Sequence, residues 1–250
     1  MRRKIIAGNW KMNKDHREGA ALASEICGGL AKGTLPCEVV LIPPFTTLPS
    51  VIDAIRGSAV QAGAQDLFYE DEGAFTGEIS GRMLRSLGCT YALVGHSERR
   101  HVIGEGGEVL AKKLRAALRN ELLPIYCVGE LLRERESGEA FEVVTKQLRE
   151  CCGGLRPEEF SRVAIAYEPV WAIGTGKTAT PADASGMHGV IRKLITDMFG
   201  AAASGKTPIL YGGSVKPETA RGLLADPEID GLLVGGASLS PASFLGIIPR

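Results

Sequence analysis

Glu168 stands at the end of a short apolar run and directly before a proline, a position that suits a catalytic base. The run Arg162–Tyr167 has the composition of a strand, and proline disfavours the helical region for the residue before it, so we expect Glu168 to close a strand. Glycines in the segment 172–176 allow close approach of the backbone to a ligand and leave the segment free to move. The pattern predicts a carboxylate beneath a mobile lid.

Other chemically useful groups follow other apolar runs. Asn9 and Lys11 come after the first run and share one face of an extended chain, whereas His96 and Glu98 come after the fourth. A carboxylate removes a proton next to a carbonyl only when the resulting oxyanion is stabilised, which a lysine and a histidine can do. Each residue alone has an ordinary structural explanation, such as a surface lysine or a core histidine. Their joint meaning therefore depends on whether the fold brings them together.

The chain alternates short apolar runs of strand length with longer segments of helical periodicity. The predicted strands are Lys4–Gly8, Cys37–Ile42, Ala59–Ala64, Thr90–Val94, Leu122–Cys127, Arg162–Tyr167, Thr207–Tyr211 and Ile229–Val234. The clearest helical segments are Glu18–Leu30, Glu108–Leu118, Phe141–Leu148, Ser185–Phe199 and Pro217–Leu224. Thr180 as an N-cap and Pro181 in the first turn predict where one helix begins.

Strict alternation of strand and helix predicts an α/β fold with parallel strands joined by right-handed crossovers. Eight such units in 250 residues fit a closed (β/α)8 TIM barrel of eight parallel strands with outer helices, because doubly wound sheets normally have fewer strands. No linker or shift of composition divides the chain, so we expect a single domain over residues 1–250. Active sites of such barrels lie at the C-terminal strand ends, where the side chains named above would converge.

Glycine pairs follow the last two predicted strands. Gly212 and Gly213 precede Ser214 after the seventh strand, and Gly235 and Gly236 come after the eighth. Barrels that bind phosphate hold it at this place on backbone N–H groups and a helix N-terminus. Together with the acid, the imidazole and the lysine, these pairs predict proton transfer on a small phosphorylated carbonyl compound.

Composition limits which binding partners and which cellular compartment we expect for the protein. Lys and Arg together number 29, as do Asp and Glu, so the formal net charge is zero, and we expect neither nucleic-acid nor membrane binding. The six cysteines form no C-x-x-C pair and no cluster with zinc spacing, so we expect buried free thiols, a reducing cytoplasmic setting and no metal. The N-terminal residues lack a hydrophobic stretch long enough for a signal peptide.

Several motifs together resemble the triosephosphate isomerase family. They are GNWKMN (8–13), AFTGEIS (74–80), GHSERR (95–100), CVGE (127–130), AYEPVWAIGTGKT (166–178), YGGSV (211–215) and VGGASL (234–239). The resemblance covers essentially the full length. It implies interconversion of dihydroxyacetone phosphate and D-glyceraldehyde 3-phosphate through an enediol(ate), in glycolysis and gluconeogenesis, without a cofactor or a metal.

The resemblance also implies roles for the residues at the strand ends. Glu168 matches the base that moves a proton between two carbons, and His96 matches the neutral group that polarises the carbonyl. Lys11 matches a fixed cation beside the substrate, Asn9 a hydrogen-bonding partner, and Glu98 the carboxylate that positions the lysine. The pKa of His96 would be lowered if the helix after the fourth strand pointed its N-terminus at the ring.

Phosphate binding and assembly follow from the same resemblance. It assigns Asn9 and Lys11 to substrate binding and the backbone of Gly174, Ser214, Gly235 and Gly236 to the phosphate, with residues 172–176 as a closing lid. Relatives are mostly homodimers in which the loop at residues 73–80 enters the partner, and Phe75 and Thr76 fit that role. The chain departs from the family pattern at Asp66, His101 and Leu131, which affects neighbouring and interface details.

Two alternatives remain open at the level of sequence. A Schiff-base aldolase on the same barrel would use Lys11 as its nucleophile, and borohydride trapping with substrate would detect it. A non-catalytic barrel that binds a phosphate ligand would have lost its activity, although Lys11, His96 and Glu168 are all present.

Overall fold

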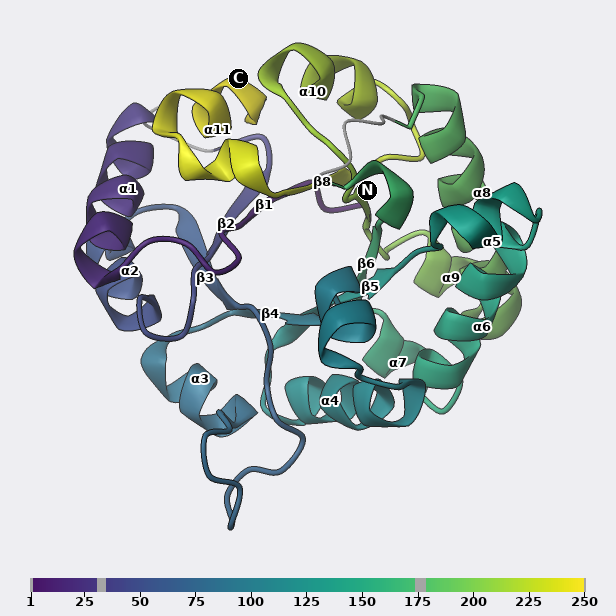
Figure 1. Ribbon diagram of the computed structural model, residues 1–250, viewed down its shortest axis with the longest axis horizontal. Helices are drawn as coiled ribbons and strands as arrows, with labels where there is room; N and C mark the ends of the chain where they lie inside the picture. Colours follow the sequence, from purple (N-terminus) through teal and green to yellow (C-terminus); the bar gives the residue numbers. More distant parts are fainter. Residues whose placement is uncertain (1, 31–34, 174–178, 250) are drawn as a thin grey trace.

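The computed structural model describes residues 2–30, 35–173 and 179–249. Within these residues the chain forms a closed barrel of eight parallel strands surrounded by helices (Figure 1). The strands are β1 (Ile5–Asn9), β2 (Glu38–Ile42), β3 (Val60–Ala64), β4 (Tyr91–Val94), β5 (Leu123–Val128), β6 (Ala164–Tyr167), β7 (Ile209–Tyr211) and β8 (Gly231–Val234). Their order in the barrel follows the sequence, and β1 closes the ring against β8. The predicted α/β class and single-domain (β/α)8 architecture are confirmed.

Helices connect the strands and cover the outside of the barrel. They are α1 (His16–Gly29), α2 (Leu48–Ile55), α3 (Gly81–Leu87), α4 (Gly107–Arg119), α5 (Leu132–Glu136), α6 (Ala140–Cys152), α7 (Pro157–Phe160), α8 (Pro181–Phe199), α9 (Ala201–Ser204), α10 (Pro217–Leu224) and α11 (Pro241–Ile247). Each predicted helical segment is present, Pro217–Leu224 with the predicted ends and the other four with shifted ends. Short helices give little periodicity, and α2, α3, α5, α7, α9 and α11 were not predicted, although the eight-residue α10 was.

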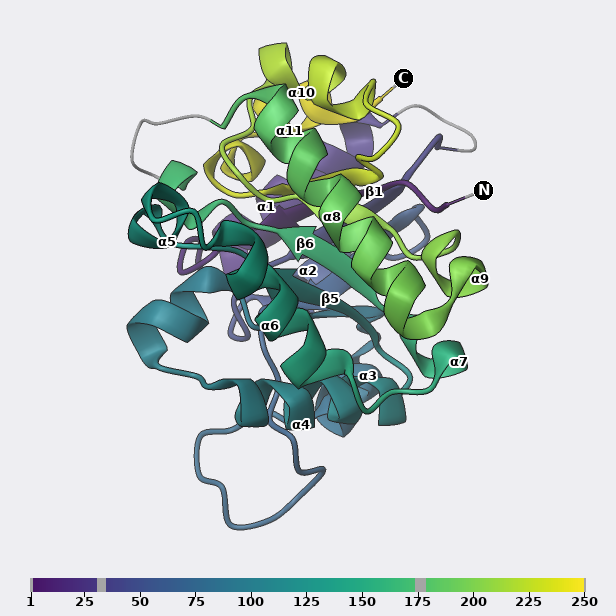
Figure 2. The same cartoon turned by 90° about the vertical axis from the view of Figure 1, so that its right-hand side faces the viewer.

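Apolar side chains fill two layers on either side of the strands. Alternate residues of β1 show the division, since Ile5 and Ala7 pack inside the barrel while Ile6 packs between the barrel and the helices. Figure 2 shows α6 and α8 side by side across β5 and β6. Strands buried on both faces explain why the sequence reads as nearly continuous apolar runs.

The start of α8 agrees with its sequence signals. The Thr180 hydroxyl accepts a hydrogen bond from the Asp183 N–H, and the Asp183 carboxylate accepts one from the Thr180 N–H in return. This reciprocal cap, with Pro181 at the first turn, fixes where the helix begins after the predicted lid. The predicted N-terminus of this helix is confirmed.

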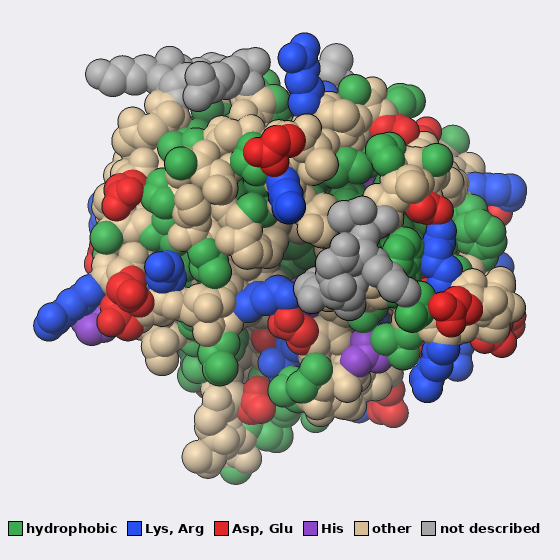
Figure 3. Space-filling model, turned by 45° about the horizontal axis from the view of Figure 1, so that its top comes forward, with side chains coloured by type: hydrophobic (Ala, Val, Ile, Leu, Met, Phe, Trp, Pro, Cys, Tyr) green, Lys and Arg blue, Asp and Glu red, His purple; other side chains and the backbone are tan. Residues whose placement is uncertain are grey.

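Cysteines and surface character also match the sequence. The six cysteines are free thiols, and all but Cys27 are buried. On the face shown in Figure 3, positive and negative side chains are interspersed. Among the described residues, no helix is long and apolar enough to cross a membrane.

His188 of α8 is buried in the layer between helix and barrel. Its Nδ1 lies 3.1 Å from the Glu228 carbonyl oxygen, and its ring stands edge-on to Tyr167. Nε2 has no hydrogen-bond partner in the described part of the chain, so the ring is neutral with its proton on Nδ1. Burial lowers the pKa of His188 to about 4.

This buried imidazole predicts a loss of stability in mild acid. The unfolded chain takes up a proton on His188 near pH 6.5, whereas the folded chain does so only near pH 4, so the stability from this residue falls with pH across that window. Between pH 7 and pH 5 we expect the parent to lose about 2 kcal/mol more of its unfolding free energy than a His188→Gln variant. Urea titrations of both proteins at the two pH values measure this difference. Equal losses of unfolding free energy in the two proteins would contradict the assignment of His188 as a neutral ring.

Candidate active site

The predicted chemical groups meet at the C-terminal ends of the strands. There a cavity of about 420 Å³ opens between the loops that follow β1, β4, β6, β7 and β8. Its lining is Asn9, Lys11, His96, Glu168, Ile173, Gly212, Gly213, Ser214, Val215, Lys216, Leu233, Gly235, Gly236 and Ala237. Glu98 contacts the cavity through Lys11, and Gly174 lies outside the described residues. Apart from Gly174, the structure brings the predicted site residues together.

Glu168 follows β6 directly and is almost fully buried. Its Oε1 lies 3.0 Å from His96 Nε2, and its Oε2 accepts a hydrogen bond from the Ser97 N–H at 2.9 Å. Two glycines make room for this residue, because a Cβ at Gly129 would lie 1.8 Å from the Glu168 carbonyl oxygen and one at Gly212 would lie 2.9 Å from its Cγ. The carboxylate is therefore held by close backbone packing around it.

The hydrogen bonds of His96 define its protonation state. The Glu98 N–H points at Nδ1 from 3.3 Å, so Nδ1 accepts and the proton of the neutral ring is on Nε2, facing Glu168. Burial of the ring lowers its pKa, but the adjacent Glu168 carboxylate raises it further, and the net direction is upward. The expectation of a lowered pKa is thus wrong for this arrangement, in which the base rests against the ring.

The pKa of Glu168 moves in the opposite direction. Burial raises it, whereas the His96 ring, the Ser97 N–H and the charge of Lys11 lower it, with a net lowering. The carboxyl is therefore ionised near neutral pH although it is buried. Its contacts with His96 and Ser97 must break before the carboxylate can reach a ligand in the cavity.

Lys11 has a constrained backbone and a fixed side chain. Its φ of 52° is unusual for a residue other than glycine. The Asn9 side-chain oxygen accepts a hydrogen bond from the Lys11 N–H at 3.0 Å, and Gln65 Nε2 donates to the Lys11 carbonyl at 2.8 Å. The Lys11 ammonium lies 2.5 Å from Glu98 Oε1. This arrangement suits a fixed cation better than an amine nucleophile, and it disfavours the Schiff-base alternative.

Gln65 was not identified as part of the site from the sequence. It also donates to the Ile42 carbonyl at 3.0 Å, so it ties the loop that carries Lys11 to β2. The available signal was its position one residue beyond β3, where the other site residues stand relative to their own strands. Lys216, at the start of α10, was also missed, and it adds a further positive charge to the cavity wall.

Gly235 and Gly236 leave open space on the far wall of the cavity. Gly235 has only Lys11 Cε near the place of a Cβ, at 3.7 Å, and Gly236 has nothing within 4 Å. Gly236 opens the short helix η3 (Gly236–Leu239), whose first backbone N–H groups have no partner within their helix. These groups face an open space flanked by lysines, which is suited to an anion.

The segment that leads into the predicted lid is firmly anchored. Glu130 is fully buried, and its Oε1 accepts hydrogen bonds from Trp171 Nε1 at 2.8 Å and from the Tyr167 hydroxyl at 3.0 Å. The Arg135 guanidinium covers the Trp171 ring at 4.9 Å. Residues 170–172 form one helical turn, η2 (Val170–Ala172), so the chain is rigid up to that point.

Asp66, a departure from the family pattern, is accommodated by the buried Lys113 and the partly exposed Arg99. Lys113 donates to both of its carboxylate oxygens at 2.8 and 2.7 Å, and Arg99 lies 2.9 Å away. Burial raises the pKa of Asp66 despite these cations. Glu105 contacts the same lysine and arginine, so two acids balance two bases beneath the loops that follow β3 and β4.

The closed parallel barrel and the acid, imidazole and lysine at its C-terminal end define an α/β barrel with the side chains of an acid–base enzyme. Comparison with known proteins gives the family. The family model for triosephosphate isomerase matches residues 4–250. A triosephosphate isomerase of Moorella thermoacetica is 54% identical over 248 residues, which cover 99% of this chain and 98% of the relative. One of Roseiflexus castenholzii is 52% identical over 249 residues, covering 99% and 97%. The chain belongs to the triosephosphate isomerase family and is an isomerase.

The contact between His96 and Glu168 predicts a specific titration behaviour. In the unliganded parent, nitrogen NMR of the imidazole should show His96 titrating above the ordinary pH range of histidine, because the carboxylate faces the ring. In a Glu168→Gln variant the carboxylate is gone and burial dominates, so the midpoint should fall below that range. A midpoint that does not move would show that the two groups are not in contact in solution.

Proposed function

We propose that the chain interconverts dihydroxyacetone phosphate and D-glyceraldehyde 3-phosphate through an enediol(ate), as an enzyme of glycolysis and gluconeogenesis. The observation that carries the proposal is the buried Glu168 carboxylate beside the His96 imidazole and Lys11, in one cavity with a glycine-lined wall. Membership in the triosephosphate isomerase family supports the same reaction. No cofactor is required, because the step moves only protons.

Glu168 is the base in this proposal. Because the Glu168 carboxylate is already ionised and buried, few water molecules must leave it before it reacts. When it leaves His96 and Ser97 for the substrate, it gives up the contacts that lower its pKa and becomes a stronger base. The lid, whose residues 174–178 lie outside the described part, would drive this movement by closing over the phosphate, an action for which this family is itself a standard example.

His96 and Lys11 stabilise the oxyanion that forms on the substrate. The His96 ring has its proton on Nε2, directed into the cavity, once Glu168 has moved away. The Lys11 ammonium is oriented by Glu98, and Asn9 both fixes the Lys11 backbone and lines the cavity. Such donors act strongly because they are already oriented before charge develops.

The phosphate would bind at the opposite wall of the cavity. Ser214, Gly235 and Gly236 supply backbone N–H groups there, and Gly174 of the lid would add another. Lys11 contributes the charge that the whole molecule lacks, since its net charge is zero. Phosphate binding energy would thus hold the reacting carbons against Glu168.

Replacing the base tests the reaction directly. Glu168→Gln keeps the shape and removes the proton acceptor, so we expect kcat to fall by roughly 10²–10⁴-fold with the fold retained. A coupled assay of dihydroxyacetone phosphate formation measures this loss. Glu142→Gln, on the exposed side of α6, serves as the matched control and should retain full activity. A Glu168→Gln enzyme within a few-fold of the parent would remove this residue from the role.

We further propose that residues 1–250 form one domain and that two copies form a homodimer through the loop at residues 73–80. This loop extends away from the ring of helices at the lower edge of Figure 1. Phe75 at its tip is 40% exposed. Val102 and Ile103, which follow β4, the strand next to β3, are also exposed, as is Met12 after β1. Exposed apolar residues on neighbouring loops indicate a protein contact.

Charge placed on the loop tip tests the assembly. Phe75→Asp with Thr76→Asp should yield monomers with poor activity, because desolvating two carboxylates in an interface is costly. Light scattering after size exclusion measures the mass, and the coupled assay measures the rate. Phe141→Asp, also an exposed phenylalanine but on α6, should remain dimeric. A fully active monomer would show that the site needs no neighbour.

The cellular setting of the protein is proposed to be the cytoplasm. Support comes from the free thiols of all six cysteines, which a reducing compartment preserves, and from the phosphorylated triose substrate.

A further inference from the structure

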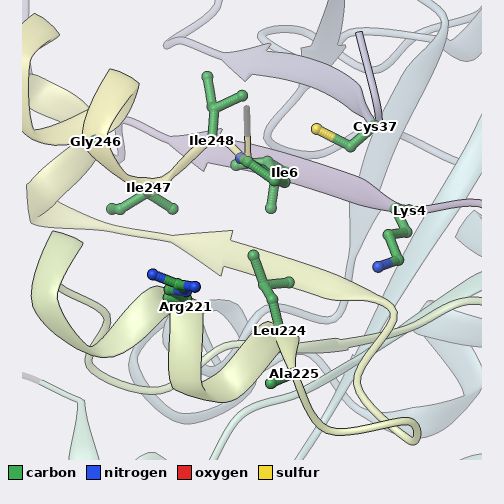
Figure 4. Close-up of a pocket in the computed structure, with 10 residues that line it drawn as sticks. Lys4, Ile6, Cys37, Arg221, Leu224, Ala225, Gly246, Ile247 and Ile248 are labelled. Atoms are coloured by element: carbon green, nitrogen blue, oxygen red, sulfur yellow. The ribbon is translucent and has the colours of Figure 1, made fainter.

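A second cavity lies at the other end of the barrel, away from the catalytic groups. It has a volume of about 670 Å³ and opens between the C-terminal ends of α10 and α11 and the starts of β1 and β2 (Figure 4). Its lining is Lys4, Ile6, Cys37, Arg221, Leu224, Ala225, Gly246, Ile247, Ile248 and Pro249. None of these residues lines the catalytic cavity. The volume lies within the usual range of small-molecule sites, about 300–1,000 Å³.

The floor of this cavity is apolar. Ile6 and Ile247 are buried at its base, and the Leu224 side chain projects toward Ile6 in Figure 4. Burial raises the pKa of the Cys37 thiol to about 11, so this side chain is uncharged near neutral pH. The apolar part of a ligand would therefore contact Ile6, Leu224, Ile247 and the uncharged Cys37 side chain.

The charged groups of the cavity wall have one sign. Lys4 and Arg221 are the ionisable cations among the described lining residues, and that lining includes no carboxylate, although Lys4 also borders a neighbouring hollow lined by Asp226 and Asp230. The side chain of neither residue has a hydrogen bond or an ion pair in the part of the chain that the structure describes. The neighbouring Arg2 and Arg3 differ, since they pair with Asp230 at 2.6 Å and Glu38 at 3.4 Å. The cavity thus has two cationic side chains without ion-pair partners above an apolar floor.

We propose that this cavity binds an amphipathic anion, namely a medium-length aliphatic chain with a carboxylate head. The chain packs against Ile6, Leu224 and Ile247. The head pairs with Arg221, because a guanidinium fork matches the two oxygens of a carboxylate. Lys4 lies across Leu224 from Arg221 in Figure 4 and adds to the positive potential at the mouth.

Octanoate is the probe that tests this site on the intact protein. Equilibrium dialysis with labelled octanoate, with inorganic phosphate saturating the catalytic cavity, should detect one molecule bound per chain. Octan-1-ol, which has the same chain without the charge, should bind at least about tenfold more weakly, as expected for the loss of a charge-assisted hydrogen bond. Octanoate that is displaced in full by phosphate, or that fails to bind, would overturn the proposal.

Matched variants locate the binding. Arg221→Gln should weaken octanoate binding about tenfold, and Leu224→Glu should abolish it by placing a negative charge on the floor. Arg17→Gln, an exposed arginine of α1 far from the cavity, should bind as the parent does. Retained isomerase activity in all three shows that they are folded. Parental affinity in both Arg221→Gln and Leu224→Glu would place the anion elsewhere and refute the assignment.

Discussion

The barrel closes where β8 begins at a residue without a side chain. A Cβ at Gly231 would lie 1.9 Å from the Ile5 carbonyl oxygen, closer than any real contact, so β1 and β8 can pair only with glycine at this position. That pairing completes the ring of parallel strands. All chemistry at the C-terminal rim depends on it, because residues as far apart in sequence as Lys11, Glu168 and Gly235 meet only in a closed barrel.

Close packing at glycine residues also accounts for the buried charge of Glu168. Desolvation opposes ionised Glu168, and an isolated carboxylate there would take up a proton instead. Packing at Gly129 and Gly212 brings the residue close enough for the Ser97 N–H and the His96 ring to reach it. The fold therefore supplies donors that compensate for lost water, and these donors can be exchanged for substrate without returning the carboxylate to solvent.

Features that depend on local sequence could be predicted, whereas features that depend on contacts between distant residues could not. The strands were found because burial on both faces leaves a local apolar run, and Glu168, His96 and Lys11 were found because each stands at a strand end. Gln65 and Lys216 were missed, since their roles arise from contacts across loops. The direction of the His96 pKa was wrong because it depends on where the Glu168 side chain rests, which no local pattern records.

Helices α10 and α11 run from the catalytic rim to the second cavity. α10 and α11 each follow a loop of the catalytic rim and end at the second cavity, and they pack closely, since a Cβ at Gly246 would lie 3.2 Å from Pro217. An anion that displaced either helix would change the rim, and linkage requires phosphate to change the affinity for that anion by the same factor. Such coupling and direct competition differ in how the binding of the anion depends on phosphate concentration. Competition weakens binding without limit as phosphate rises, whereas coupling reaches a plateau once the catalytic cavity is full.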